Sequence, residues 1–177
     1  MIGILENNNN LVSLLSFIPE LIILEGMISI ILLEIIPNKR KYIYSSTLGV
    51  IILSFIALLF SLINLQDSQL FMNLIVVDPF SNFFKIIFLL STFIIVLVSE
   101  SSVEIKDGIK AEYYFLLLVI LLGMFLMASS INLLMVYLAI ELVSIPSYIL
   151  AGMSKNNKSS NEASLKYVIF GSFASGL

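Results

Sequence analysis

Residues 112–153 form one apolar stretch of 42 residues, and this feature limits the chain to very few folds. A helix rises ~1.5 Å per residue and the hydrocarbon core of a membrane is ~30 Å thick, so ~20 residues are enough to cross it. An apolar stretch about twice that length predicts two membrane-spanning helices joined by a turn. The small and polar residues Ser129-Ser130-Ile131-Asn132 mark the place where we expect that turn.

The composition agrees with a membrane protein and excludes several kinds of chemistry. Hydrophobic residues make up 59% of the chain and charged residues only 12%, whereas soluble domains contain about 25% charged residues. The chain has no Cys, His or Trp, so it lacks thiolate and imidazole ligands and the usual catalytic pairs that contain them. We therefore expect no cofactor or metal in this chain, no nucleic acid partner, and membrane subunits and lipid as its surroundings.

Hydrophobic runs along the chain predict an all-α integral membrane protein with five spans and the start of a sixth, all in a single helical domain that covers residues 1–177. Asp78 and Pro79 form a helix-start signal, because Asp is a favoured N-cap and Pro a favoured first helical residue. The predicted spans are 17–36, 45–65, 79–99, 112–130, 131–153 and 161–177.

Seven of the nine basic residues lie in alternate connections between the spans, and they predict the orientation of the chain. Cytoplasmic or matrix loops are enriched in Lys and Arg, so the N-terminus should face the periplasm or the intermembrane space. The first 20 residues contain neither Lys nor Arg and resemble no secretory or transit signal, which favours synthesis in an organelle or in a bacterium. The seven residues are Lys39, Arg40, Lys41, Lys106, Lys110, Lys155 and Lys158.

Glu141 lies almost at the centre of the span 131–153 and is the first candidate functional residue. A charged side chain there costs at least ~2.5 kcal/mol, and such residues commonly mark a transport path. Tyr137, Glu141, Ser144 and Tyr148 are four, three and four residues apart, so they share one helix face that should contact other helices or buried water. Pro146 leaves one backbone carbonyl without its helical donor. A neutral glutamic acid that only joins helices is the structural alternative.

Lys166 is the second candidate, about one turn into the sixth span. It could pair with Glu162 four residues earlier, or point into a bundle, because the small residues from Gly171 to Gly176 favour close helix packing. These two alternatives remain open at this point. Lys85, a few residues into the third span, is expected to extend outward to the membrane interface.

The first predicted span contains three carboxylates that need a separate explanation. Glu20 lies near its outer end and Glu34 near the basic cluster 39–41, so both are expected at membrane interfaces. Glu25 lies deeper and could be a second buried acid. No stripe of polar residues at helical spacing supports a pathway through Glu25, so Glu141 is the stronger candidate.

The run from Asn132 to Gly176 resembles subunit 2 of respiratory complex I, the NADH:ubiquinone oxidoreductase subunit called N in bacteria. The matching blocks are YLAIELVS, which contains Glu141, and EASLKY, which contains Lys166, followed by small residues. The segments FIPELIIL, DPFSNFF and EYYFLLLVILLGMFLMASS resemble the same family more weakly, so the resemblance covers most of the chain.

The resemblance implies the N-terminal portion of an antiporter-like bundle that takes part in proton translocation. It implies proton-transfer roles for Glu141 and Lys166. It also implies other complex I membrane-arm subunits as partners, with NADH, FMN, iron–sulfur clusters and ubiquinone bound elsewhere, and a mitochondrial or bacterial inner membrane. The family's later lysine helices are not among the 177 residues, so we expect a companion chain that carries them. Pro146 departs from the family motif.

The mechanism expected from these residues is a change in proton affinity. A carboxylate binds protons less readily when an ammonium approaches, and more readily when it withdraws. Movement of Lys166, or of a lysine on a companion chain, would therefore switch Glu141 between release and uptake. Two other functions remain open, a cation/proton antiporter or membrane hydrogenase subunit, and a structural membrane subunit that moves no protons.

Overall fold

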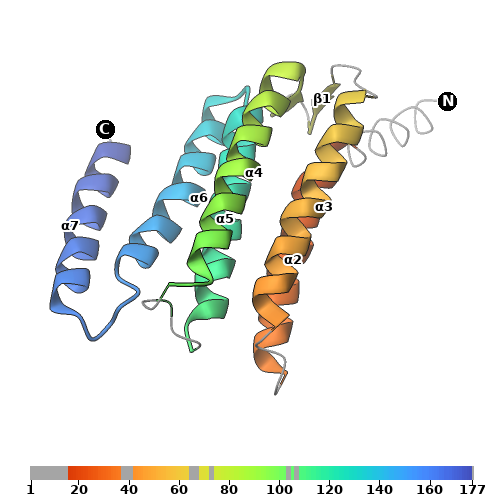
Figure 1. The fold of residues 1–177 in the computed structure, drawn as a ribbon. Coiled ribbons are helices and arrows are strands. Elements are labelled where there is room, and N and C mark those ends of the chain that lie inside the picture. Colours follow the sequence, from red (N-terminus) through yellow and green to blue (C-terminus); the bar gives the residue numbers. More distant parts are fainter. Residues whose placement is uncertain are drawn as a thin grey trace.

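The computed structural model is a bundle of long helices that run up and down side by side (Figure 1). It describes residues 16–36, 42–63, 68–71, 74–102, 105 and 108–176. The predicted all-α fold class is confirmed, with the addition of one short β-hairpin. The helices are α2 (Ile18–Ile35), α3 (Ile43–Ile63), α4 (Pro79–Ser99), α5 (Lys110–Ser129), α6 (Leu133–Ala151) and α7 (Lys158–Ser175).

Four of the described helices, α3 to α6, are long and apolar enough to cross a membrane. Helices α2 and α7 have 18 residues each, close to the length of the others. They differ from the other four in charge, because each contains three charged residues. These are Glu20, Glu25 and Glu34 on α2, and Lys158, Glu162 and Lys166 on α7.

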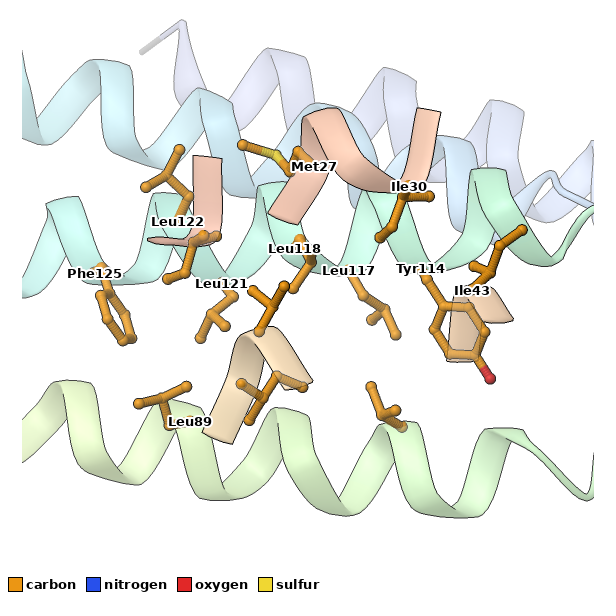
Figure 2. Close-up of a cluster of buried hydrophobic side chains, with 14 of the residues drawn as sticks. Met27, Ile30, Ile43, Leu89, Tyr114, Leu117, Leu118, Leu121, Leu122 and Phe125 are labelled. Carbon is orange, nitrogen blue, oxygen red and sulfur yellow. The ribbon is translucent and has the colours of Figure 1, made fainter. Parts of the chain in front are cut away.

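Helix α5 is the centre of the bundle, and it contacts α2, α3, α4 and α6. Six of its apolar side chains, spread along the helix, are completely or nearly completely buried between these neighbours (Figure 2). Met27 and Ile30 of α2, Ile43 of α3 and Leu89 of α4 belong to the same buried core. The buried α5 side chains are Tyr114, Leu117, Leu118, Leu121, Leu122 and Phe125.

Two glycines allow neighbouring helices to approach closely. A Cβ atom on Gly26 of α2 would lie 2.6 Å from both methyl groups of Val50 on α3. On Gly123 of α5 it would lie 2.8 Å from a methyl group of Val143 on α6 and 3.1 Å from that residue's backbone nitrogen. Small residues at helix contacts are typical of membrane bundles, where van der Waals packing holds the helices together.

The β-hairpin was not predicted from the sequence. Strands β1 (Ser68–Leu70) and β2 (Ile75–Val77) are antiparallel, with Leu70 opposite Ile75. Leu70, Ile75 and Val77 are buried and pack on Leu126 and Met135. Ile75 also forms a β-bridge with Ser130, so the hairpin covers the end of the bundle where α5 ends and α6 begins. Strands of three residues are too short to give a clear alternating pattern in the sequence.

Local sequence signals set several helix ends. Asp78 is the N-cap of α4, as predicted, and its carboxylate accepts a 2.7 Å hydrogen bond from the Ser81 N–H. The Asp78 N–H in turn donates to Ser81 Oγ at 3.1 Å, which completes a capping box. Asn132 caps α6 in a similar way, through a 2.9 Å bond from the Leu134 N–H. The chain turns between Ser129 and Leu133, at the predicted place.

Of the seven basic residues predicted in the loops, the three that the structure describes lie at the end of the bundle opposite the hairpin. Lys110 begins α5, and Lys155 and Lys158 lie in and just after the connection between α6 and α7 (Figure 1). This placement agrees with the alternating charge pattern in the sequence. The cluster 39–41 and Lys106, which belong to the same pattern, lie outside the described residues.

Candidate functional site

The predicted polar stripe lies on one continuous helix, α6, and its two ends have different surroundings. Tyr148 is buried, with only 8% of its surface exposed, whereas Tyr137 is 50% exposed. Glu141 and Ser144 lie between them and are partly buried. The stripe therefore begins at a covered end against α7 and leads to an open end, with the carboxylate between the two.

Helix α7 covers the buried end of the stripe through two contacts with Tyr148. The ring of Tyr167 meets the Tyr148 ring edge-to-face, with centroids 4.7 Å apart and planes at 77°. A Cβ atom on Gly171 would lie only 2.1 Å from the Tyr148 hydroxyl oxygen, so only glycine fits there. Gly171, one of the small residues predicted to favour close helix packing, thus lies directly against Tyr148.

Serine hydroxyls on both helices donate to backbone carbonyls. Ser164 Oγ donates to the Tyr148 carbonyl at 2.9 Å, and Ser160 Oγ donates to the Ala151 carbonyl at 2.8 Å, so both join α7 to α6. Ser144 Oγ donates to the Ile140 carbonyl of its own helix at 2.8 Å. Ser144 therefore uses its proton within α6, and Glu141 supplies the one carboxylate of the stripe.

Pro146 is buried inside α6, and the helix continues through it. Proline has no N–H to donate to the carbonyl four residues earlier, that of Leu142. The next residue, Ser147, donates its hydroxyl to the Ser144 carbonyl at 2.7 Å. The proline thus changes the backbone hydrogen bonding within one turn of Glu141 without ending the helix.

Lys166 pairs with Glu162 on its own helix, one of the two arrangements that the sequence left open. Both side chains are about two-thirds exposed, 65% for Lys166 and 66% for Glu162. Among the described residues, the structure has no ion pair between Lys166 and Glu141, and no residue of α7 is buried. Tyr148, by contrast, contacts Tyr167 of α7 and lies against Gly171.

The expectation that Lys85 extends to the membrane interface is wrong. Its ammonium nitrogen lies 2.7 Å from Glu20 Oε1, and both side chains are only 1% exposed. The same nitrogen lies 5.8 Å from the centre of the Phe125 ring. Glu20 is thus also buried rather than exposed at an interface. Besides Glu141 and Lys166, the bundle thus has a third charged site, the buried pair of Glu20 and Lys85, which was not predicted from the sequence.

A weak signal for this site is present in the sequence of α4. Ser81, Lys85, Thr92 and Ser99 are spaced by four, seven and seven residues, so they form a polar stripe on one helix face. All four are buried. The partner Glu20 is on another helix far away in the sequence, and no local pattern identifies it.

The remaining carboxylates of α2 have different environments. Glu25 is exposed on the outer face of the helix, so the structure does not place it among buried acids. Glu34 is partly buried near the end of the helix. Among the described residues, no group of three or more acidic side chains is placed to hold a metal ion.

Comparison with known proteins shows what this arrangement is similar to. Residues 130–177 match the family described as NADH:quinone oxidoreductase/Mrp antiporter, transmembrane. The chain is 42% identical to NADH-quinone oxidoreductase subunit N 2 of Chloroherpeton thalassium over 168 residues, which cover 92% of this chain and 32% of that protein. It is 37% identical to subunit N of an Anaeromyxobacter species, over 96% of this chain and 33% of that protein.

The resemblance to the subunit N family is therefore confirmed. A third relative, NAD(P)H-quinone oxidoreductase subunit 2 of Gloeobacter violaceus, is 35% identical over 90% of this chain and 31% of its own length. The chain thus spans about a third of the length of these subunit N relatives. The segment that matches the transmembrane family begins at the α5–α6 turn and contains both Glu141 and Lys166.

Proposed function

We propose that this chain is a membrane-arm component of an NADH:quinone oxidoreductase and takes part in proton translocation. The observation that supports this most directly is Glu141, a carboxylate in the middle of a membrane helix within the segment similar to the transmembrane family. Ionisable residues at such depth are costly and commonly serve ion or proton paths. The names of the relatives supply the class of complex.

Glu141 and Lys166 are the residues to which we assign proton transfer. Glu141 takes up and releases the proton, and the approach of an ammonium favours release. In the described chain the ammonium of Lys166 is paired with Glu162, so it must leave this partner before it acts on Glu141. An exposed pair of this kind is held by only about 0–1 kcal/mol, so the exchange is energetically accessible. Movement of one charge across the membrane changes the free energy by ~2.3 kcal/mol per 100 mV of membrane potential.

The chain contributes no redox chemistry in this proposal. It lacks Cys and His, the usual ligands of iron–sulfur clusters and haem. NADH, FMN, iron–sulfur clusters and ubiquinone are then bound by other subunits of the complex. The partners are the neighbouring membrane-arm subunits, lipid, and a companion chain that contributes further helices. The bacterial sources of the relatives favour the bacterial inner membrane over the mitochondrial one.

Replacement of Glu141 by Gln tests this function, because Gln keeps the size and polarity of the side chain but cannot release a proton. Membrane vesicles that contain the complex are supplied with NADH, and protons moved per NADH oxidised are measured. We expect a lower ratio while the complex still assembles. Glu112→Gln, at an exposed site in the first turn of α5, is the control and should keep the normal ratio. A normal ratio in Glu141→Gln would make this carboxylate structural.

A cation/proton antiporter subunit is the second candidate, because the matching family description joins NADH:quinone oxidoreductases with Mrp antiporters. Mild detergent extraction, native gel separation and mass spectrometry distinguish the two candidates. Comigration with NADH dehydrogenase activity supports the oxidoreductase, and the same bands report whether a companion chain is present. Comigration with antiporter subunits alone would contradict it.

A further inference from the structure

The buried pair of Glu20 and Lys85 is incompletely satisfied. Glu20 Oε1 accepts from the Lys85 ammonium at 2.7 Å, but Glu20 Oε2 is buried and has no hydrogen-bond partner among the residues that the structure describes. A buried carboxylate oxygen without a partner is unfavourable, because it has lost its hydration and gained nothing in return. The ion pair alone therefore does not explain how this carboxylate is stable inside the bundle.

Two further buried polar side chains, Asn82 and Ser129, also lack hydrogen-bond partners among the described residues. Asn82 is completely buried, and within the described part of the chain neither its amide nitrogen nor its amide oxygen has a hydrogen-bond partner. Ser129 is 1% exposed, and its hydroxyl oxygen has no partner in that part of the chain either. Native proteins leave few such groups unsatisfied, and a cluster of them commonly indicates bound water.

Helix geometry places these groups together. Asn82 lies one turn before Lys85 on α4, and Ser129 lies one turn after Phe125 on α5. The Lys85 ammonium lies 5.8 Å from the Phe125 ring centre, which sets these two residues side by side. Because α4 and α5 run in opposite directions (Figure 1), Asn82 and Ser129 both lie on the hairpin side of Lys85.

We propose that ordered water is bound at this place between α2, α4 and α5, where it bridges Glu20 Oε2, Asn82 and Ser129. Water offers two donors and two acceptors, which match a carboxylate oxygen, an amide and a hydroxyl. A metal cation fits less well, because the Lys85 ammonium already lies against the same carboxylate and would repel it. The bound water gives the second carboxylate oxygen of Glu20 a hydrogen-bond donor within the bundle, at a site separate from Glu141.

Structure determination of the complex in which this chain resides is the direct test. In a density map that resolves ordered water, we expect at least one water peak within hydrogen-bond distance of both Asn82 and Glu20 Oε2. The proposal is overturned if the Asn82 amide bonds directly to Glu20 or Ser129 and no water peak is present between them.

Replacement of Asn82 by Leu gives an independent test, because the melting temperature should change in opposite directions with and without bound water. If water joins Asn82 to Glu20, the substitution removes a partner of a buried carboxylate, and the melting temperature of the complex should fall. If the site is dry, the substitution removes two unsatisfied polar atoms, and the melting temperature should rise. Ser91→Ala, at an exposed position of the same helix whose hydroxyl bonds only to the Ile87 carbonyl, is the control and should change little.

Discussion

Lys85 and Glu20 form a buried ion pair, with the ammonium nitrogen 2.7 Å from one carboxylate oxygen, and this pair joins helix α4 to helix α2. The two residues are distant in the sequence, and each belongs to a helix that is otherwise mostly apolar. The pair therefore connects two helices that both pack on α3 and α5. It also introduces two charges into a part of the bundle that would otherwise depend on apolar packing.

Replacement of Lys85 by Met should strongly destabilise the protein. Removal of one partner leaves the buried carboxylate of Glu20 unpaired, which costs about 3–5 kcal/mol. The double variant Glu20→Gln/Lys85→Met removes both charges and should recover part of this loss. Thermal unfolding of the detergent-extracted protein measures both effects. Lys166→Met, at an exposed pair, is the control and should cost no more than about 1 kcal/mol. Equal losses for Lys85→Met and Lys166→Met would refute the buried pair.

Replacement of Gly123 by Ala should push α5 and α6 apart. The new methyl group would lie 2.8 Å from Val143 and 3.1 Å from its backbone nitrogen, and backbone cannot move aside as a side chain can. Overpacking of this kind costs about 1–3 kcal/mol. Gly49→Ala on α3 is the matched control, because nothing lies within 4 Å of its Cβ position. The control should be neutral or stabilising by up to about 1 kcal/mol, since Ala favours helix. The same thermal measurement applies, and an unchanged Gly123→Ala variant would mean that the helices are not this close.

Replacement of Gly171 by Ala should weaken the contact of α7 with the Tyr148 end of the stripe. The added Cβ would overlap the Tyr148 hydroxyl oxygen at 2.1 Å, so Tyr148→Phe, which removes that oxygen, should partly rescue the variant. A double-mutant cycle gives the interaction between the two positions. Limited proteolysis in the α6–α7 connection reports whether α7 has moved. Purely additive effects of the two substitutions would show that they do not touch.

Replacement of Asp78 by Ala should remove the capping box of α4. The carboxylate accepts the Ser81 N–H at 2.7 Å, and loss of such a cap costs about 0.5–2 kcal/mol. Because the capped end adjoins the hairpin, we expect faster amide hydrogen exchange at residues 80–82 than in the parent protein. Ser101→Ala, an exposed hydroxyl beyond the other end of α4, serves as control. Unchanged exchange at the start of α4 in Asp78→Ala would contradict a role for the cap.

The sequence by itself determined the local structure of this protein. Long apolar runs have few alternatives to helices in a membrane, because every backbone polar group must be satisfied within the segment. The N-cap at Asp78 and the turn after Ser129 also followed from residues within a few positions of one another. The helical spacing that places Tyr137, Glu141, Ser144 and Tyr148 on one face of α6 is a local property too.

Only the tertiary structure decided which helix faces meet and which charges pair. From the sequence Lys85 is expected at the membrane interface, whereas the fold buries it against Glu20. By sequence Lys166 could either pair with Glu162 or point into a bundle, and the fold pairs it with Glu162. The short hairpin next to α5 likewise depends on apolar contacts with Leu126 and Met135 from other elements. Pairing between distant segments depends on how complete helix surfaces fit together, and no short stretch of sequence contains that information.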